Sequence, residues 1–456
     1  MLQKKHKIHF VGIGGIGMSG IAEVLLNSGY VVTGSDLQES DATRRLRSLG
    51  ARVFVGHEEE NLAGNPSVVV ISTAVKYSNP EVLEARRRHI PVIPRAEMLA
   101  ELMRMKYGVA VAGSHGKTTT TSMISAVLST AGLDPTMVIG GRVHMFGANA
   151  KMGQGEFLVA EADESDGSFL LLSPTIAVVT NIDKEHMDFH QSMERLNESF
   201  LTFMNKVPFY GFAVLCIDDA NVRGLLPKVR KRFATYGLSA EADFSAQNLR
   251  MTAAGVEFAV LHRGKLLGDL RLHLPGRHSA TNALAAVAVA HELEIPFSRT
   301  GEALGAFTGI HRRFEVKGEP NGILVIDDYG HHPTEIRATI GAIRDSWKRP
   351  LTVVFQPHRY SRTRDLFDEF LTAFEGADRL VLTEIYPANE DPIAGVTGEA
   401  LYHAIKRKGH LDVEFVPDKS QIVTLLAEKL NDGEIALTLG AGDIYKVGEG
   451  LVEALR

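Results

Sequence analysis

The chain has very little cysteine, no excess of positive charge and no long apolar run. Cys216 is the only cysteine among 456 residues, which excludes a disulfide within the chain and a thiolate metal cluster. Lys and Arg number 49 against 55 Asp and Glu, so no basic excess is available to neutralise nucleic-acid phosphates or an anionic membrane. The basic start, residues 1–9, is followed by no apolar stretch typical of a signal peptide or membrane span. We therefore expect a cytoplasmic protein that binds neither nucleic acid nor membrane.

The length and the residue patterns indicate several α/β domains. A hydrophobic share of 45% and a charged share of 23% are typical of a soluble globular protein, and 456 residues predict about three domains. Apolar strand-like runs alternate with helix-like runs, which predicts parallel sheets. We expect a Rossmann-like domain over 1–105, a central P-loop ATPase-type α/β domain over 106–309 and a C-terminal Rossmann-like α/β domain over 310–456. Short alternating segments with glycines over 244–274 predict antiparallel strands.

The most informative motif is the run Gly113-Ser114-His115-Gly116-Lys117-Thr118-Thr119-Thr120. It follows an expected buried strand over 107–112 and precedes an expected helix over 121–131. Such a turn aims backbone N–H groups and a helix N-terminus at phosphate oxygens. Lys117 is expected to reach the β- and γ-phosphates, and the Thr118 hydroxyl to bind magnesium. The usual first glycine position is occupied by Val111, so the loop is shorter than usual; the alternative is a plain strand-to-helix turn.

A second glycine motif lies near the N-terminus. Gly12, Gly14 and Gly17 match G-x-G-x-x-G after a short expected strand over 9–11, and Asp36 ends a later strand. This is the pattern of a dinucleotide-binding turn in which the acid binds a ribose. It predicts a nucleotide diphosphate on this helix N-terminus, either NAD or a UDP-linked ligand. The alternative is that the glycines serve only close helix–sheet packing.

Two polar segments follow expected strands of the central domain. Residues 161–166 contain four acids that repel one another unless a cation or a nearby lysine offsets them, and magnesium prefers such oxygens. Residues 181–188 include His186, which we place one strand over from Glu161, so that both face the γ-phosphate. A solvated acidic turn and a capping or surface histidine are the alternatives.

Further candidates come from the helix start near residue 280 and from the third domain. Asn282 offers the paired donor and acceptor that an adenine edge needs, although Ser279 or Thr281 could simply cap the helix. Arginines at 312–313 suit charge that develops in phosphoryl transfer. Residues 327–333 and 356–362 follow consecutive expected strands and are rich in histidine and arginine, which suits a carboxylate ligand. Solvated polar loops are the alternative for both.

Together these segments resemble the Mur ligase family over essentially the whole chain, and most resemble its alanine-adding branch. The residues that carry the resemblance are Gly12 to Gly20, Glu161 to Phe169, Asp327 to Pro333 and the shortened phosphate loop. The resemblance implies an ATP-dependent acid–amino-acid ligase of peptidoglycan synthesis. ATP would phosphorylate the lactyl carboxylate of UDP-N-acetylmuramate, and the amine of L-alanine would displace phosphate. The implied cofactors are ATP and Mg²⁺, and the implied state is a monomer or homodimer.

The same resemblance implies a role for each matching residue. Catalytic roles fall to Lys117, His186, Arg313, His331 and Arg359, and magnesium ligation to Thr118, Glu161 and His186. ATP would be bound by Gly113, Ser114, His115, Gly116, Lys117, Thr118, Thr119, Asn282, Arg313 and Asp328. The two substrates would be bound by Gly14, Gly15, Ile16, Gly17, Asp36, Ser72, Thr73, Asn149, Tyr329, His331, His358, Arg359 and Arg362.

Two positions depart from patterns seen in the family, and three other functions are alternatives. Ser279 stands where an asparagine is often found, and Phe200 stands where some related ligases carry a modified lysine, so no carbamylated lysine is expected. A nicotinamide oxidoreductase would use the first glycine motif and leave the phosphate loop idle. A nucleotide-binding switch would leave the third domain unexplained. A Mur ligase that adds a recycled peptide to the same sugar nucleotide is the alternative within the family.

Overall fold

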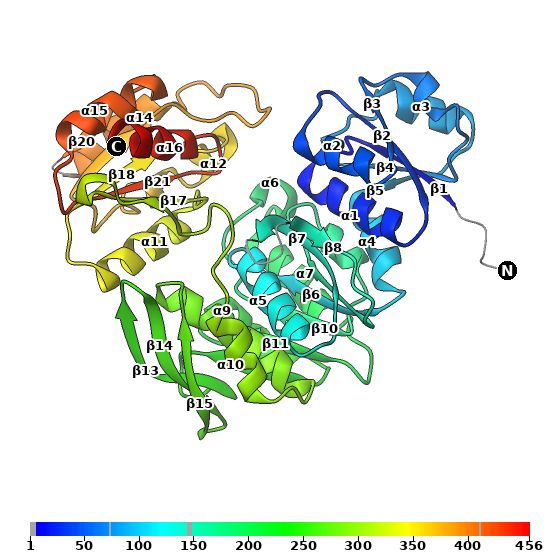
Figure 1. Ribbon diagram of the computed structural model, residues 1–456, viewed down its shortest axis with the longest axis horizontal. Coiled ribbons are helices and arrows are strands. Elements are labelled where there is room, and N and C mark those ends of the chain that lie inside the picture. Colours follow the sequence, from blue (N-terminus) through cyan, green and yellow to red (C-terminus); the bar gives the residue numbers. More distant parts are fainter. Residues whose placement is uncertain (1–5, 73, 144–147, 410–411) are drawn as a thin grey trace. The chain divides into compact units, whose positions relative to one another are not determined.

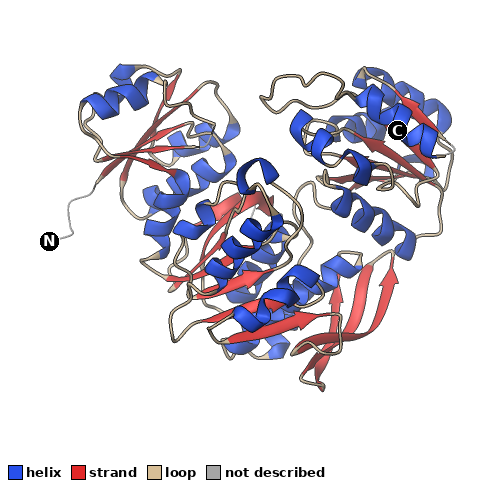
Figure 2. Cartoon of the chain, turned by 180° about the vertical axis from the view of Figure 1, so that it is seen from behind, coloured by secondary structure: helices blue, strands red, loops and turns tan. Residues whose placement is uncertain are grey.

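The computed structural model describes residues 6–72, 74–143, 148–409 and 412–456; the side chains of Ile16, residues 141–143 and residues 148–149 lie outside that description. The predicted α/β class is confirmed, because helices accompany three separate sheets (Figure 2). Contacts between Cα atoms divide the chain into two compact units. The first unit holds Met1–Gln247, Ala259–Leu270 and Thr281–Phe307, and the second holds Asn248–Phe258, Arg271–Ala280 and Thr308–Arg456.

The first sheet is fully parallel, with strand order β3-β2-β1-β4-β5. Its strands are β1 (Lys7–Val11), β2 (Val31–Asp36), β3 (Arg52–Val55), β4 (Val68–Ile71) and β5 (Val92–Pro94), and its helices are α1 (Ile16–Asn27), α2 (Asp41–Ser48), η1 (Glu59–Leu62) and α3 (Pro80–Arg87) (Figure 1). Side chains of β1 pack on both faces of the sheet. Ile8 and Phe10 belong to the buried cluster that includes α1, whereas Val11 belongs to the cluster that includes α3. The edge strand β5 was not predicted, because Pro94 argues against a strand; an edge position tolerates the missing N–H.

The central sheet has strand order β15-β14-β13-β12-β11-β10-β6-β9-β7-β8. Its strands are β6 (Tyr107–Ala112), β7 (Thr136–Val143), β8 (Ala148–Lys151), β9 (Phe157–Glu161), β10 (Ile176–Val179), β11 (Phe212–Cys216), β12 (Phe233–Gly237), β13 (Phe244–Thr252), β14 (Gly255–His262) and β15 (Lys265–Leu272). The helix α4 (Arg95–Met103) connects the first sheet to this one and contacts β4 and β5. The helices of the central sheet are α5 (Lys117–Thr130), η2 (Ser168–Leu171), α6 (Met187–His190), α7 (Met193–Met204), α8 (Ala220–Leu225), η3 (Leu226–Lys228), α9 (Arg277–Glu292) and α10 (Phe297–Gly305). Two-residue connections join β13, β14 and β15, and only antiparallel neighbours can be joined that tightly.

The third sheet lies in the second unit, with strand order β16-β17-β21-β18-β19-β20 and one antiparallel edge strand, β16. Its strands are β16 (Glu315–Gly318), β17 (Leu324–Asp328), β18 (Leu351–Phe355), β19 (Arg379–Leu382), β20 (Val413–Phe415) and β21 (Ile435–Leu439). Its helices are η4 (Pro320–Gly322), α11 (Pro333–Ser346), α12 (Tyr360–Asp365), α13 (Phe367–Phe370), α14 (Gly398–Lys408), α15 (Lys419–Lys429) and α16 (Tyr445–Ala454).

Two expected helices have different limits in the structure. The helix after the phosphate loop begins at Lys117 and not at residue 121, because Gly116 supplies a left-handed turn with φ 79° that starts it. The threonines that follow have weak helix propensity, which hid the true start. The sequence over 362–374 is helix-like and predicts a single helix, which is wrong: α12 and α13 are separate short helices, because Leu366 between them leaves the helical region at φ −116°, ψ 21°.

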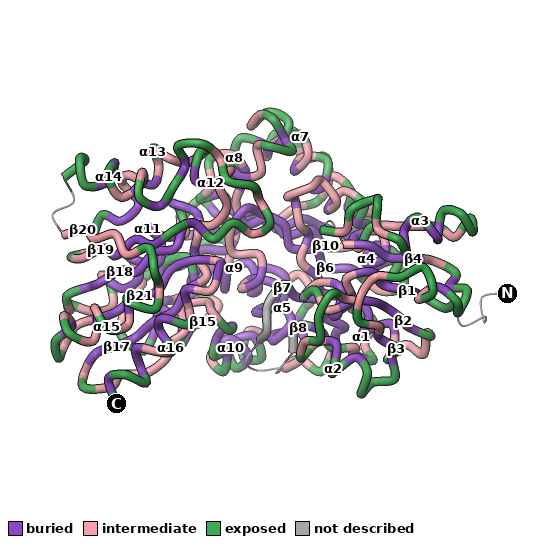
Figure 3. The backbone as a smooth tube through the Cα atoms, turned by 90° about the horizontal axis from the view of Figure 1, so that it is seen from above, coloured by how far each residue is buried: buried purple, intermediate pink, exposed green. Residues whose placement is uncertain are grey.

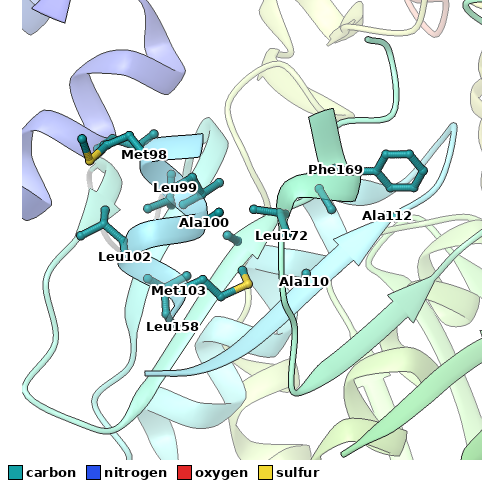
Figure 4. Packing of buried hydrophobic residues seen from close by; sticks show 14 of the residues in the cluster. Met98, Leu99, Ala100, Leu102, Met103, Ala110, Ala112, Leu158, Phe169 and Leu172 are labelled. Atoms are coloured by element: carbon teal, nitrogen blue, oxygen red, sulfur yellow. The ribbon is translucent and has the colours of Figure 1, made fainter. Parts of the chain in front are cut away.

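Buried residues follow the strands, which are drawn largely in the buried colour in Figure 3. The continuous core of the first unit includes α4, whose apolar side chains pack beside Leu158 of β9 and Leu172 (Figure 4). The central strands are therefore buried, and the loops at their carboxyl ends project from them. Among the described residues, no helix has the length and apolar character needed to cross a membrane.

Candidate active site

The phosphate loop leaves β6 at Ala112 and is anchored to the end of β10. Ser114 N donates to Asn181 O (3.1 Å), and Thr180 Oγ1 donates to His115 O (2.6 Å). Gly113 has φ 136°, and a Cβ there would lie 2.0 Å from Thr180 Oγ1, so only glycine fits. Val111 is fully buried inside β6, which explains why the loop starts two residues later than usual.

The ammonium group of Lys117 lies within the loop. Its Nζ donates to Gly113 O (2.6 Å), Ser114 O (3.3 Å) and Glu164 Oε1 (2.8 Å). Burial lowers the pKa of Lys117, but the charges of Glu164 and Asp163 outweigh it, and the net pKa is raised. The lysine therefore remains charged, and its ammonium group lies where it could contact a phosphate oxygen.

The acidic turn after β9 contacts Lys117. The sequence predicts that either a cation or a nearby lysine offsets the charges of this turn, and the structure provides the lysine. The side chain of Glu164 is 1% exposed. Burial raises its pKa to about 7, against the opposing effect of the Lys117 ammonium, and Asp163 adds to the rise. Within the described residues, Glu164 Oε2 is buried without a hydrogen-bond partner. The site therefore has one acceptor atom to spare for a cation or a donor.

A carboxylate and a hydroxyl meet at the first turn of α5. Thr118 Oγ1 donates to Glu161 Oε2 (3.2 Å), and Gly140 N donates to Glu161 Oε1 (2.6 Å). A hydroxyl beside a carboxylate is a donor set that magnesium accepts. Lys117, Glu161 and Asp163 line a cavity of about 330 Å³ together with Gly15, Gly17, Ser72, Arg95 and neighbouring apolar residues.

His186 does not lie one strand over from Glu161; that expectation is wrong. Strand β6 stands between β9, which Glu161 ends, and β10, which precedes His186. The error arose because strand order in a doubly wound sheet does not follow chain order. His186 instead belongs to a group with Glu164 and Glu185, whose ligand atoms all lie within 4.8 Å of one another. That group could hold a cation.

Asn282 is 8% exposed on α9 and lies against the phosphate loop. A Cβ at Gly116 would lie 2.9 Å from Asn282 Oδ1, so the loop glycine gives this amide room. Ser279 donates from Oγ to Pro275 O (2.8 Å) at the start of the same helix. Phe200 is fully buried, and its ring centroid lies 5.3 Å from that of Phe169 at a tilt of 59°, which places it in the core.

The first glycine motif and Asp36 do come together. Gly14 N donates to Asp36 Oδ2 (2.8 Å), and Gly12 turns with φ 79°. Both glycines, Gly15, Asp36 and Ser72 line a cavity of about 720 Å³ at the carboxyl edge of the first sheet. Thr73 lies outside the described residues, Ile16 begins α1 and Asn149 lies in β8, and nothing is described of their side chains.

In the second unit, the polar segments after β17 and β18 lie side by side. His358 stacks on Tyr386 with ring centroids 5.7 Å apart and lies 5.6 Å from His331. Burial, followed by the charges of His331 and Arg362, lowers the pKa of His358 to about 3. Arg362 Nη1 lies 3.0 Å from His358 Nδ1. Sequence reasoning missed Tyr386, because a lone tyrosine in a loop after β19 carries no motif.

The two arginines at 312 and 313 are used differently. Arg312 bonds to Asp327 Oδ2 (3.2 Å), Gly440 O (2.6 Å) and Gly442 O (2.9 Å), which fixes it within the fold. Arg313 lies over the Tyr329 ring at 5.0 Å. Asp328 accepts from Phe314 N and Gly330 N, both at 2.7 Å.

Arg359 has an unusual backbone at φ 69°, ψ 139°. A non-glycine residue is rarely held there, and such strain is concentrated at functional sites. Its Nε is buried without a hydrogen-bond partner among the described residues. The guanidinium of Arg359 therefore has a donor available to a ligand.

A lysine-bearing phosphate loop beside a cavity and a glycine turn with its acid are features of a nucleotide-binding enzyme. Family models match residues 7–107 (Mur ligase family, catalytic domain), 111–290 (Mur ligase middle domain) and 312–442 (Mur ligase, glutamate ligase domain). The chain belongs to the Mur ligase family, as its sequence resemblance predicted.

Within that family the chain is similar over its whole length to UDP-N-acetylmuramate–L-alanine ligases. The protein of that name from Geobacter sp. strain M21 is 59% identical, over 100% of this chain and 99% of that protein. The one from Geobacter sulfurreducens is 58% identical over the same shares. The crystal structure of the UDP-N-acetylmuramate–alanine ligase of Thermotoga maritima matches with a TM-score of 0.83 and 31% identity, over 98% of both chains.

Proposed function

We propose that this protein joins L-alanine to the lactyl carboxylate of UDP-N-acetylmuramate at the expense of ATP, in peptidoglycan precursor synthesis. The full-length identity of 59% to a ligase of that name carries the proposal. The γ-phosphoryl group passes to the carboxylate, ADP leaves, and the amine of L-alanine attacks the acyl carbon and releases phosphate. The nicotinamide oxidoreductase alternative has no support in the family assignment.

The phosphate loop provides the ATP site in this proposal. Lys117 stabilises the triphosphate, because its ammonium already lies among loop carbonyls (Gly113 O at 2.6 Å). Gly113, Ser114, His115, Gly116, Thr118 and Thr119 surround the phosphates, and Asn282 contacts the adenine. In the second unit, Arg313 and Asp328 are assigned to ATP, and Tyr329, His331, His358, Arg359 and Arg362 to the alanine and lactyl groups.

Magnesium is proposed to be held by Thr118 at one position, beside the β- and γ-phosphates, and by Glu161 and His186 at a second, near the transferred phosphoryl group. Three features support its fit: the hydroxyl–carboxylate contact of Thr118 and Glu161 (3.2 Å), the His186 group, and the unused buried oxygen of Glu164. Bound there, the ion would neutralise charge on the transferring phosphoryl group. The glycine turn, Asp36, Ser72, Thr73 and Asn149 are assigned to the UDP-sugar. We further propose a cytoplasmic monomer or homodimer with the domain boundaries expected from the sequence.

The test is phosphate release by the purified chain. Release is expected only when ATP, Mg²⁺, UDP-N-acetylmuramate and L-alanine are all present, with Lys117→Ala as the inactive control. Phosphate release that does not depend on L-alanine would contradict the proposal, as would turnover of NAD without ATP.

A ligase that accepts a recycled peptide is the second candidate. Murein peptide ligase from Psychrobacter arcticus shares the fold, with a TM-score of 0.72 at 24% identity over 99% of this chain and 98% of that chain. Identity to the alanine ligases is more than twice as high. We expect L-alanine to be used far better than the tripeptide when both are offered, and the reverse order would favour the peptide ligase.

A further inference from the structure

A buried histidine links the acidic turn after β9 to the short helix α6. His190 is the last residue of α6 and is 3% exposed, and its Nε2 lies 2.8 Å from Glu164 O. A carbonyl oxygen can only accept, so Nε2 carries a proton and donates it. Gly167 N donates to the same oxygen (3.1 Å) and closes the acidic turn. The ring of His190 therefore holds the backbone of this turn at the residue whose side chain contacts Lys117.

The helix that carries His190 has little stability of its own. α6 has four residues, and a single helical turn is unfavourable in isolation. Left-handed residues flank it, His186 at φ 56° and Gln191 at φ 65°, and such a backbone persists only where its surroundings hold it. His190 N donates to His186 O (3.0 Å), so the two histidines lie one helical turn apart. The bond from His190 to Glu164 O thus also restrains His186.

The same bond brings candidate cation ligands from two segments together. Glu164, Glu185 and His186 offer ligand atoms that all lie within 4.8 Å of one another. Glu164 belongs to the acidic turn, whereas Glu185 and His186 immediately precede α6. Two carboxylates at this distance repel each other unless a positive charge offsets them. A hydrogen bond that keeps the two segments together therefore matters most before a cation binds.

Packing alone is the other role open to this histidine. Its ring lies edge-on to that of Phe189, with ring centroids 4.9 Å apart, and a phenylalanine at position 190 would keep this contact. Phenylalanine lacks only the donor at Nε2, and Glu164 O would still accept from Gly167 N. The two roles therefore differ in one hydrogen bond and can be separated by substitution.

We propose that His190 is a positioning residue, which holds the acidic turn against the His186 segment at the distance at which both can bind one divalent cation. The inference rests on the proposed function, in which the cation serves phosphoryl transfer. In this role His190 itself binds neither the cation nor a substrate. Partners of this kind orient metal ligands, and their loss weakens metal binding by about 10- to 100-fold.

The test measures Mn²⁺ binding to the full-length protein without nucleotide, by the electron paramagnetic resonance signal of free Mn²⁺. The site in question is the one that His186→Ala abolishes. His190→Phe should weaken Mn²⁺ binding there about tenfold, the size of one good hydrogen bond. His190→Gln, whose amide can donate to Glu164 O, should remain within about threefold of wild type. His403→Phe, on α14 with 56% of its side chain exposed, is the matched control and should change nothing.

Steady-state kinetics adds a readout that a packing role would not move. The Mg²⁺ concentration for half-maximal phosphate release should rise about tenfold in His190→Phe. The KM for UDP-N-acetylmuramate and the rate at saturating Mg²⁺ should remain within about threefold of wild type. A rate loss that saturating Mg²⁺ does not restore would indicate a packing role and overturn the inference.

Two results of the Mn²⁺ titration would also overturn it: an affinity in His190→Phe within about twofold of wild type, and equal losses in His190→Phe and His190→Gln. Either result would leave the proposed function standing. If His190→Phe does not fold by circular dichroism, His190→Met, which also lacks a donor, takes its place. Failure of wild-type protein to release phosphate with all four components would overturn the proposed function, whereas the Mn²⁺ titration, made without nucleotide, would still decide the role of His190.

Discussion

The pairing of Lys117 with Glu164 predicts how ATP affinity depends on one carboxyl group. Glu164 Oε1 lies 2.8 Å from Lys117 Nζ, so a phosphate oxygen that approaches the ammonium also approaches this carboxylate. Glu164→Gln removes the negative charge and retains an oxygen that can accept from Lys117. We expect the substitution to strengthen ATP binding at alkaline pH.

The magnitude follows from the pKa of Glu164, which burial raises to about 7. A bound triphosphate raises that pKa further, so binding takes up a proton and weakens as pH rises above 7. At pH 8 about one molecule in ten carries the protonated acid, which costs wild-type binding about tenfold, or about 1.4 kcal/mol. At pH 6 the acid is already protonated and the difference disappears.

The assay is equilibrium titration of metal-free ATP into both proteins at pH 6, 7 and 8. ATP titrates identically in both experiments, so the ratio of dissociation constants isolates Glu164. We expect Glu164→Gln to bind about tenfold more tightly at pH 8 and within twofold at pH 6. AMP, which lacks the β- and γ-phosphates, is the control and should bind both proteins equally. The same pH slope in both proteins would refute the reasoning.

Three further predictions concern the loop, the single cysteine and a buried acid. Gly113→Ala should lower turnover about a hundredfold, because its Cβ would lie 2.0 Å from Thr180 Oγ1, whereas Gly64→Ala, with open space around it, should not; equal rates would contradict this. Burial raises the pKa of Cys216 to about 12, so disulfide-exchange reagents should label the native protein about a thousandfold more slowly than the unfolded chain at pH 8, and fast native labelling would show that β11 is exposed. Burial also raises the pKa of Asp328 to about 6, against the charge of Arg313. Because the folded pKa lies above the unfolded one, wild-type protein loses about 3 kcal/mol of stability as pH rises from about 4 to about 6 and above, and Asp328→Asn does not. In thermal unfolding, the stability of Asp328→Asn relative to wild type should therefore increase over that pH range. A stability difference that does not change with pH would contradict this prediction.

Much of the fold could be predicted because its strands are short apolar runs. The strand Tyr107–Ala112 was predicted with its observed limits. What failed depends on tertiary context. The proline in β5 is tolerated only at a sheet edge, and the break at Leu366 between α12 and α13 has no glycine or proline to announce it.

The parts of the candidate site that a local motif fixes could be predicted from the sequence. The parts in which strand order decides which residues lie near one another could not. The glycine turn near Asp36 and the phosphate loop with Lys117 have local signatures, and Gly14 N does donate to Asp36. The pairing of Lys117 with Glu164 was one of two ways to offset the acidic turn. The position of His186 relative to Glu161 depends on β6 lying between β9 and β10, which chain order does not reveal.

The central claim is that the γ-phosphoryl group of ATP passes to the sugar-acid carboxylate. The most direct test labels that carboxylate of UDP-N-acetylmuramate with ¹⁸O and follows a single turnover with L-alanine, ATP and Mg²⁺ by mass spectrometry. We predict one ¹⁸O atom in each phosphate released, because the amine displaces phosphate together with the carboxylate oxygen that bound it. Released phosphate without ¹⁸O would contradict the acyl-phosphate route.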